Sequence, residues 1–292
     1  MNLQGSWVAM PTPFTEDNQV DIEGFKLLIA RQIKYGTNQL FILGSAGEVT
    51  LLSIEEKKLI VKSVIAYMKD RAARGLKVVP VFFSAASFTT EASVEFAQFC
   101  EAEGADGVVF TVPPYVLITQ HAAKTHLDTC MSSVSIPCGI YNNPSRLGVQ
   151  VLPETIKYLS EKHPNFVVDK EAMPSVEQLV QVQRLCEGKV KIMCCDYPHY
   201  SIVIPTLAIG GTGTANIGGN IIPEEAALYS RPWTDMKVIE ECRTEYFKWF
   251  LLLQELYTFS NPIVIKAALN VSAAHPEWNM VPEIMIPLVG EV

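Results

Sequence analysis

The sequence predicts an α/β protein that folds as a closed (β/α)8 barrel with additional C-terminal helices. Eight short apolar runs alternate with longer amphipathic segments, and successive runs begin 22 to 38 residues apart, enough for one strand and one crossover helix. The strands are expected to begin near Trp7, Gln39, Lys77, Gly107, Pro137, Phe166, Lys191 and Gly213. An open doubly wound sheet is the second choice, because no dinucleotide-binding fingerprint follows the first strand.

Helix boundaries are marked in the gaps between these runs. Residues 53–56 and 175–178 have the capping-box pattern, in which a serine and a Glu or Gln three residues later satisfy free N–H groups of the first turn. The remaining signals are prolines suited to first helical positions and glycines suited to helix ends: Pro153, Pro223, Gly36, Gly104 and Gly188.

The pattern changes from about Thr234 onward, and we expect a barrel over residues 1–230 and a helical extension over residues 231–292. Residues 236–259 predict one long helix rich in aromatic and leucine residues. Asn261 and Pro262 then suit the N-cap and first position of another helix through Ile263–Val271.

Composition restricts the possible partners and the compartment. The chain has 292 residues and a net charge of -8, with no Lys/Arg stripe to neutralise phosphates, so nucleic acid is not expected. No run of 18 apolar residues indicates a membrane span, and the N-terminus shows no signal-peptide pattern. The seven cysteines lack framework spacing and predict reduced thiols in a cytoplasmic protein.

The apolar run beginning at Phe166 ends on Lys170, which places an ammonium at the end of a buried strand. Burial disfavours the charged form, and a neutral lysine amine attacks ketones to form a Schiff base. The alternative is a structural ion pair between Lys170 and Asp169 or Glu171. The segment alone does not decide between them.

Other polar residues follow neighbouring strands, and carboxyl ends of barrel strands meet at one rim, where catalytic groups gather. The turn at residues 44–48 offers backbone N–H groups and the Ser45 hydroxyl to a carboxylate. Tyr141 suits a proton shuttle, and Arg146 suits a second carboxylate. Each also has an ordinary reading: a tight turn, a packed aromatic and a solvated arginine.

Two further groups of residues are weaker candidates for ligand-binding sites. Cys194, Cys195, Asp196 and His199 match no closed zinc pattern, so no metal site is expected. Residues 210–213 could cradle a phosphate, but we prefer a tight turn into the last strand.

Three segments together resemble the dihydrodipicolinate synthase / N-acetylneuraminate lyase family: residues 44–48 (GSAGE), 141–146 (YNNPSR) and 169–172 (DKEA). Their order and spacing agree from about residue 5 to residue 225, and Asn261–Lys266 resembles the family's C-terminal part. The resemblance implies a TIM barrel, a pyruvate-dependent class I lyase or aldolase, and a tetramer built from tight dimers.

By the same resemblance Lys170 forms the Schiff base with pyruvate, Tyr141 shuttles protons and Ser45 relays them. Backbone N–H groups of Ser45 and Ala46 would hold the pyruvate carboxylate, and Arg146 would receive the carboxylate of aspartate semialdehyde. The expected substrate-binding residues are Ala46, Gly47, Arg146, Ala215 and Tyr115. No metal or organic cofactor is expected, because the iminium itself is the electron sink.

The chain departs from the family pattern at three places. Ala46 stands where a second hydroxyl residue is common, and Val116 stands where the synthases carry a relay tyrosine from across the dimer interface. Tyr115 could replace that tyrosine only if the loop shifted by one residue. The loop at residues 83–88 lacks the synthases' usual glycine-rich, Asn-containing stretch, so feedback inhibition by lysine is not supported.

Three functions remain open. The first is 4-hydroxy-tetrahydrodipicolinate synthase, which Arg146 favours and Val116 opposes. The second is an aldolase or dehydratase of a 2-keto-3-deoxy sugar acid, or N-acetylneuraminate lyase. The third is a non-catalytic keto-acid-binding barrel, which the presence of both Lys170 and Tyr141 opposes.

Overall fold

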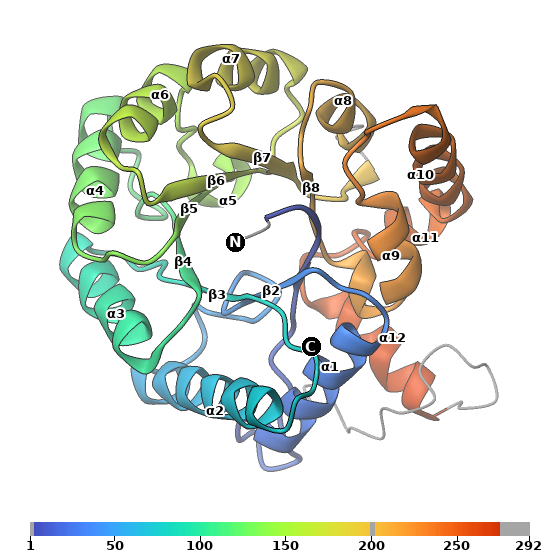
Figure 1. The fold of residues 1–292 in the computed structure, drawn as a ribbon. Helices are drawn as coiled ribbons and strands as arrows, with labels where there is room; N and C mark the ends of the chain where they lie inside the picture. The colour runs from blue at the N-terminus through green and yellow to red at the C-terminus, as the bar shows by residue number, and fades with distance from the viewer. Residues whose placement is uncertain (1–2, 199–201, 275–292) are drawn as a thin grey trace.

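The computed structural model describes residues 3–198 and 202–274, and it contains a closed barrel of eight parallel strands (Figure 1). The strands are β1 (Gly5–Ala9), β2 (Gln39–Ile42), β3 (Val81–Ser84), β4 (Gly107–Phe110), β5 (Cys138–Asn142), β6 (Phe166–Glu171), β7 (Lys191–Cys194) and β8 (Gly213–Asn216). Each strand pairs with its neighbour in the chain, and β8 pairs with β1 to close the ring. The predicted barrel is confirmed, and the open-sheet alternative is excluded.

Helices surround the barrel (Figure 1). They are α1 (Ile22–Lys34), α2 (Ile54–Ala73), α3 (Thr90–Glu103), α4 (Gln120–Ser132), α5 (Pro144–Leu147), α6 (Pro153–Lys162), α7 (Val176–Cys186), α8 (Val203–Ala208), the 3-10 turn η2 (Gly218–Asn220), α9 (Pro223–Tyr229), α10 (Met236–Lys248), α11 (Phe250–Glu255) and α12 (Ile263–Ala274). Pro153 and Pro223 begin α6 and α9, as predicted. Within the described ranges no helix has the length and apolar character needed to cross a bilayer.

Most strand starts agree closely with prediction, but β3 begins at Val81 rather than near Lys77. Pro80 explains the delay, because proline has no N–H to donate to a sheet ladder. Its carbonyl accepts the N–H of Leu40 at 3.0 Å, so it lies at the edge of the ladder.

Only one of the two predicted capping boxes is complete. In α2, Ser53 accepts the N–H of Glu56 and the Glu56 side chain accepts the N–H of Ser53. In α7, Ser175 accepts the N–H of Gln178 at 3.1 Å, but the Gln178 side-chain oxygen accepts Gln150 Nε2 at 2.8 Å instead of the Ser175 N–H. A distant amide has taken the acceptor that the cap would have used.

The predicted single helix over residues 236–259 is also wrong. It breaks at Trp249, whose ψ of 2° leaves the helical region, and α11 ends at Glu255. The change of direction buries Leu253 and lets Tyr257 reach the barrel, where its hydroxyl donates to Asp196. The division near residue 230 stays a prediction, because α10 packs against α9 and Tyr257 also bonds to the barrel.

Candidate active site

Lys170 lies near the carboxyl end of β6 with its side chain directed into a cavity at the barrel mouth. The residue is 4 % exposed, and its Nζ atom lies 4.4 Å from the ring centre of Phe41 and 4.3 Å from that of Tyr141. Burial lowers the pKa of Lys170 to about 8, and the positive charge of Arg146 adds to the decrease, while Cys195 and Asp196 oppose it. The amine is therefore partly neutral near neutral pH.

The alternative ion pair is absent from the part of the chain that the structure describes. Side chains alternate along a strand, so Asp169 and Glu171 are on the opposite face of β6 from Lys170. Glu171 accepts hydrogen bonds from Asn142 at 2.9 Å and Gln178 at 3.0 Å. Neither carboxyl oxygen of Asp169 has a hydrogen-bonded donor, and burial together with the charge of Glu171 raises the pKa of Asp169 well above its usual range.

Tyr141 is the cross-strand neighbour of Lys170, because the two residues pair in the β5–β6 register. Asn143 Nδ2 donates to the Tyr141 hydroxyl oxygen at 2.6 Å. Burial raises the pKa of Tyr141, while hydrogen bonds from Asn143 and Ser45 and the charge of Arg146 oppose the increase. The phenol therefore stays protonated and lies beside the amine.

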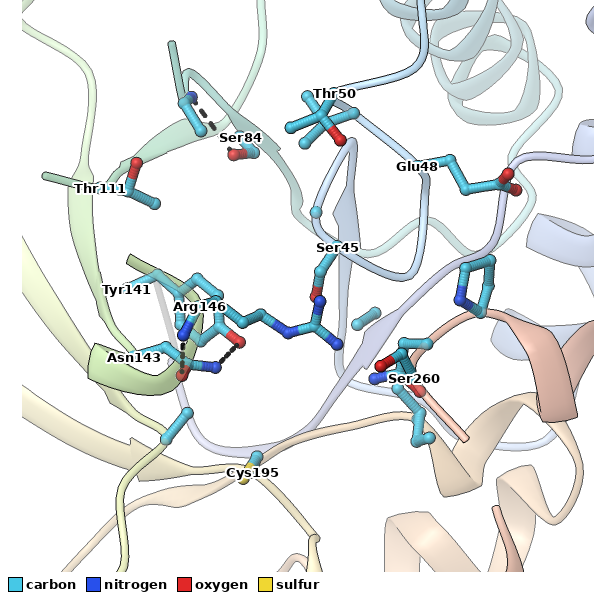
Figure 2. Close-up of a pocket in the computed structure, with 18 of the residues that line it drawn as sticks. Ser45, Glu48, Thr50, Ser84, Thr111, Tyr141, Asn143, Arg146, Cys195 and Ser260 are labelled. Atoms are coloured by element: carbon cyan, nitrogen blue, oxygen red, sulfur yellow. Dashed lines mark hydrogen bonds between the residues drawn. The ribbon is translucent and has the colours of Figure 1, made fainter. Parts of the chain in front are cut away.

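Asn143 is a site residue that sequence reasoning missed. It caps α5, with its Oδ1 accepting Ser145 Oγ at 2.6 Å and the Arg146 N–H at 3.3 Å (Figure 2). Its side chain thus joins the tyrosine to the segment that carries Arg146. An Asn before Pro144 is a helix-start signal and could have identified the cap, although not the bond to Tyr141.

The turn after β2 supplies two free backbone donors. Gly44 and Ser45 line the cavity, and within the described chain no acceptor is found for the N–H groups of Ser45 and Ala46. Ala46 contributes no side chain to the cavity, because its methyl group lies in the core. Gly47 stays a predicted substrate-binding residue: its N–H donates to the Gly44 carbonyl at 3.0 Å, and the residue shapes the turn without lining the cavity.

Arg146 and Tyr115 have different surroundings. Arg146 lines the cavity, and Figure 2 shows its guanidinium extending into the middle of it. No ion pair of Arg146 is found among the described residues. Tyr115 stays a predicted substrate-binding residue: it is 91 % exposed with a φ of 74°, and it does not line this chain's cavity. A positive φ turns the chain outward there, and Val116 is also exposed.

Strands β7 and β8 complete the wall near Lys170. Ala215 lines the cavity as predicted, and Cys195, which was not predicted as a site residue, lies there too. Burial raises the pKa of Cys195 to about 12, so it remains a thiol beside the amine and the phenol.

Asp196 has a structural role in the described chain. Its carboxyl group is fully buried and accepts hydrogen bonds from the N–H groups of Ile217 and Gly218 and the hydroxyls of Tyr229 and Tyr257. His199, the other member of the cluster considered for a metal, lies outside the described residues. Residues 3–198 and 202–274 contain no group of three side chains arranged to hold a metal ion.

The C-terminal region forms the roof of the cavity, which has a volume of about 1110 Å³. Residues 257–263 and Lys266 line it, although they are far in sequence from the barrel strands. Lys266 pairs with Glu48 of the β2 turn, and its Nζ lies 4.4 Å from the ring centre of Phe14. No spacing of residues along the chain indicates this contact, because it depends on how α12 packs.

Comparisons with known proteins agree with this geometry. The profile of the Dihydrodipicolinate synthetase family matches residues 2–281. A 4-hydroxy-tetrahydrodipicolinate synthase from Methanococcus aeolicus is 32% identical over 92% of this chain and 88% of its own length, and one from Clostridium perfringens is 31% identical over the same shares.

Solved structures of such synthases are also similar to this chain. The 4-hydroxy-tetrahydrodipicolinate synthase of Methylacidiphilum fumariolicum SolV is 27% identical with a TM-score of 0.86, covering 100% of this chain and 91% of that one. A dihydrodipicolinate synthase from Acinetobacter baumannii, solved with pyruvate, is 26% identical with a TM-score of 0.82, covering 100% and 94%.

Proposed function

Because the chain belongs to the dihydrodipicolinate synthetase family, we propose that it is a lyase that joins pyruvate to an aldehyde through a Schiff base on Lys170. The acceptor that its relatives' names support is aspartate semialdehyde, the substrate of a 4-hydroxy-tetrahydrodipicolinate synthase. The observation that most supports this proposal is the buried Lys170 amine, which lies close to two aromatic rings and has its pKa lowered to about 8.

The first half of the reaction makes an enamine. The neutral Lys170 amine attacks the pyruvate ketone, and Tyr141 protonates the carbinolamine oxygen so that it leaves as water. The free N–H groups of Ser45 and Ala46 support the assignment of the pyruvate carboxylate to the β2 turn. Loss of a methyl proton from the iminium then gives the enamine, and the proton returns to Tyr141, with the Ser45 hydroxyl on the same side of the cavity offering a path for it.

In the second half the enamine carbon attacks the aldehyde carbon. The aldehyde oxygen takes a proton as the bond forms, and water then releases the product from Lys170. The exposed, unpaired guanidinium of Arg146 suits a carboxylate at the far end of the acceptor. We expect no metal or organic cofactor, because the iminium supplies the electron sink.

A second candidate is an aldolase or dehydratase of a 2-keto-3-deoxy sugar acid, including N-acetylneuraminate. Its support is the cavity lining, which is rich in neutral hydroxyl groups, and the volume of about 1110 Å³. The lining serine and threonine residues are Ser45, Thr50, Ser84, Ser87, Thr111, Ser145, Thr258 and Ser260. A non-catalytic binder is less favoured, since binding alone needs no buried amine beside a phenol.

The deciding experiment compares acceptors. Purified protein is incubated with pyruvate and aspartate semialdehyde, or with 2-keto-3-deoxygluconate or N-acetylneuraminate alone, and products are followed by mass spectrometry. Consumption of aspartate semialdehyde supports the first function. Cleavage or dehydration of the hydroxylated acids without that consumption would replace it with the second.

Tyr141→Phe should lower the turnover of whichever substrate is accepted by about 10²- to 10⁴-fold, the usual loss of a general acid–base group. The control is Tyr158→Phe, on the outer face of α6. Equal turnover in Tyr141→Phe and wild type would remove the shuttle assignment.

We also propose that the protein self-associates, as a dimer of dimers, and that it is cytoplasmic. The assembly is supported by apolar side chains exposed in loops after three consecutive strands.

A further inference from the structure

Two hydroxyl groups on the β3–β4 side of the cavity have hydrogens with no acceptor among the described residues. Thr111 follows β4 and is 5 % exposed, and its Oγ1 atom has no hydrogen-bond partner. Ser84 ends β3, and its Oγ accepts the Ala86 N–H at 3.3 Å, which leaves its own hydrogen without an acceptor in the described chain. Both residues line the cavity. Buried hydroxyls are normally satisfied, so an unpartnered one facing a cavity points to a ligand.

The backbone at Thr111 is fixed from the helix side. His126 of α4 lies 3.0 Å from the Thr111 carbonyl through Nε2, and its Nδ1 lies 2.9 Å from Thr90 Oγ1. Burial lowers the pKa of His126, so the ring is neutral and carries one N–H. A carbonyl can only accept, so that N–H is on Nε2, and Thr90 donates to Nδ1. These bonds hold the strand end while the Thr111 side chain faces the cavity.

Charge on this wall of the cavity differs from that on the β5 side. Ser84 pairs with Val109 in the β3–β4 register, two residues before Thr111, and Figure 2 shows both on the side of the cavity away from the Arg146 guanidinium. The cationic residues that line the cavity lie on segments other than β3, β4 and the loops that follow these two strands. A carboxylate is drawn to a guanidinium, whereas two hydroxyl donors without a charge suit a neutral oxygen.

We infer that Thr111 and Ser84 form a subsite for a neutral oxygen atom of the second substrate. This rests on the proposed function, because the enamine on Lys170 must form before a second substrate reacts. The oxygen has two possible sources: the aldehyde oxygen that becomes a hydroxyl as the bond forms, or a hydroxyl group beside it. Either accepts the Thr111 and Ser84 hydrogens.

The test separates the two halves of the reaction. Exchange of the pyruvate methyl protons in D2O, followed by NMR without an acceptor, reports the enamine. The second half is measured as kcat/KM for aspartate semialdehyde, D-glyceraldehyde and propanal, the last two being a hydroxylated and a plain three-carbon aldehyde. The variants are Thr111→Val, Thr111→Ser and Ser84→Ala. The control is Thr155→Val, a buried threonine of α6 outside the cavity.

Thr111→Val should lower kcat/KM for an accepted aldehyde by about 10- to 100-fold, the usual effect of losing one buried hydrogen bond. Methyl exchange should change by much less, and Thr111→Ser should recover most of the loss. Thr111→Val breaks no protein hydrogen bond, so it should fold, which thermal denaturation checks. If Thr111→Val lowers kcat/KM for every aldehyde, the subsite binds the aldehyde oxygen. If it lowers kcat/KM for D-glyceraldehyde alone, the subsite binds the neighbouring hydroxyl group.

The subsite would be overturned if kcat/KM were unchanged in Thr111→Val. It would also be overturned if Thr111→Ser or Thr155→Val lowered kcat/KM as much as Thr111→Val does. In each case, normal methyl exchange would still support the proposed function. Absence of methyl exchange in the wild-type protein would overturn the proposed function and the subsite with it.

Discussion

At the residue scale, the chemistry depends on how burial changes three side chains within one strand. In β6, Lys170 faces the cavity, while Asp169 and Glu171 face the helices. Burial makes the neutral form of each more favourable, which frees the amine for attack and holds a proton on the carboxyl pair. The same physical cause therefore produces a nucleophile on one face and a buried acid on the other.

The lowered pKa of Lys170 predicts the pH dependence of Schiff-base formation. The neutral fraction of the amine rises with pH, so the rate of borohydride trapping with pyruvate should rise with a midpoint near pH 8. Arg146 lowers this pKa, so Arg146→Ala should move the midpoint to higher pH and Arg146→Lys should retain it. Rates measured from pH 6 to pH 10 test this. Identical midpoints in all three proteins would contradict it.

The Asp169 carboxyl predicts a stability change that depends on pH. Its folded-state pKa is raised, so the folded protein holds a proton that the unfolded chain loses above about pH 4, and stability falls as pH rises from there toward the folded pKa. Asp169→Asn removes this loss, and its amide can donate to Glu171 in place of the protonated carboxyl. We expect a gain on the order of 1–3 kcal/mol at pH 8 and less at pH 5.

Urea unfolding at both pH values measures the difference. Asp17→Asn, on an exposed loop, is the control and should change little. A destabilised Asp169→Asn at pH 8 would show that the charged carboxylate is needed.

At the element scale, the strands were predictable because each is a short apolar run with a turn on either side. Local rules failed where a distant group competed for the same atoms. The Gln178 side-chain oxygen accepts from Gln150 instead of completing its cap, and the helix breaks at Trp249, which lets Tyr257 reach Asp196. Lys170 and Tyr141 were predicted as strand-end residues, whereas the link through Asn143 needed three-dimensional geometry.

The bond from Tyr257 to Asp196 predicts how the roof is attached to the barrel. Tyr257 donates to Asp196 at 2.6 Å and stacks on Tyr197 with ring centres 4.5 Å apart. Tyr257→Phe should destabilise the protein by about 1–3 kcal/mol, because a buried carboxyl loses a donor. Tyr246→Phe is a matched control, since the buried Tyr246 hydroxyl has no partner. Equal melting temperatures in the two variants would contradict this role.

At the scale of the whole molecule, the cavity is formed by the barrel together with a segment that lies far from the barrel strands in the sequence. The barrel provides the reacting groups, and residues 257–263 provide a roof whose place no local pattern encodes. The apolar side chains exposed after β2, β3 and β4 lie in loops at the same rim and suit contact with a second copy of this chain: Leu51, Phe88, Tyr115, Val116 and Leu117.

Leu117→Asp should therefore weaken self-association, because a charge at a buried interface is costly. Light scattering after size exclusion should give a multiple of 32.3 kDa for the wild type and a smaller mass for the variant. Met236→Asp, an exposed apolar residue at the start of α10, is the control. A wild-type mass of one chain would remove the predicted assembly.

The central claim is that the Lys170 amine captures pyruvate. Borohydride should reduce the Schiff base to a stable adduct, and peptide mass spectrometry should find it on Lys170 and not on Lys266, the other buried lysine that lines the cavity. The adduct should require pyruvate and should be absent from Lys170→Ala. An unmodified Lys170 peptide after treatment with pyruvate and borohydride would contradict the account.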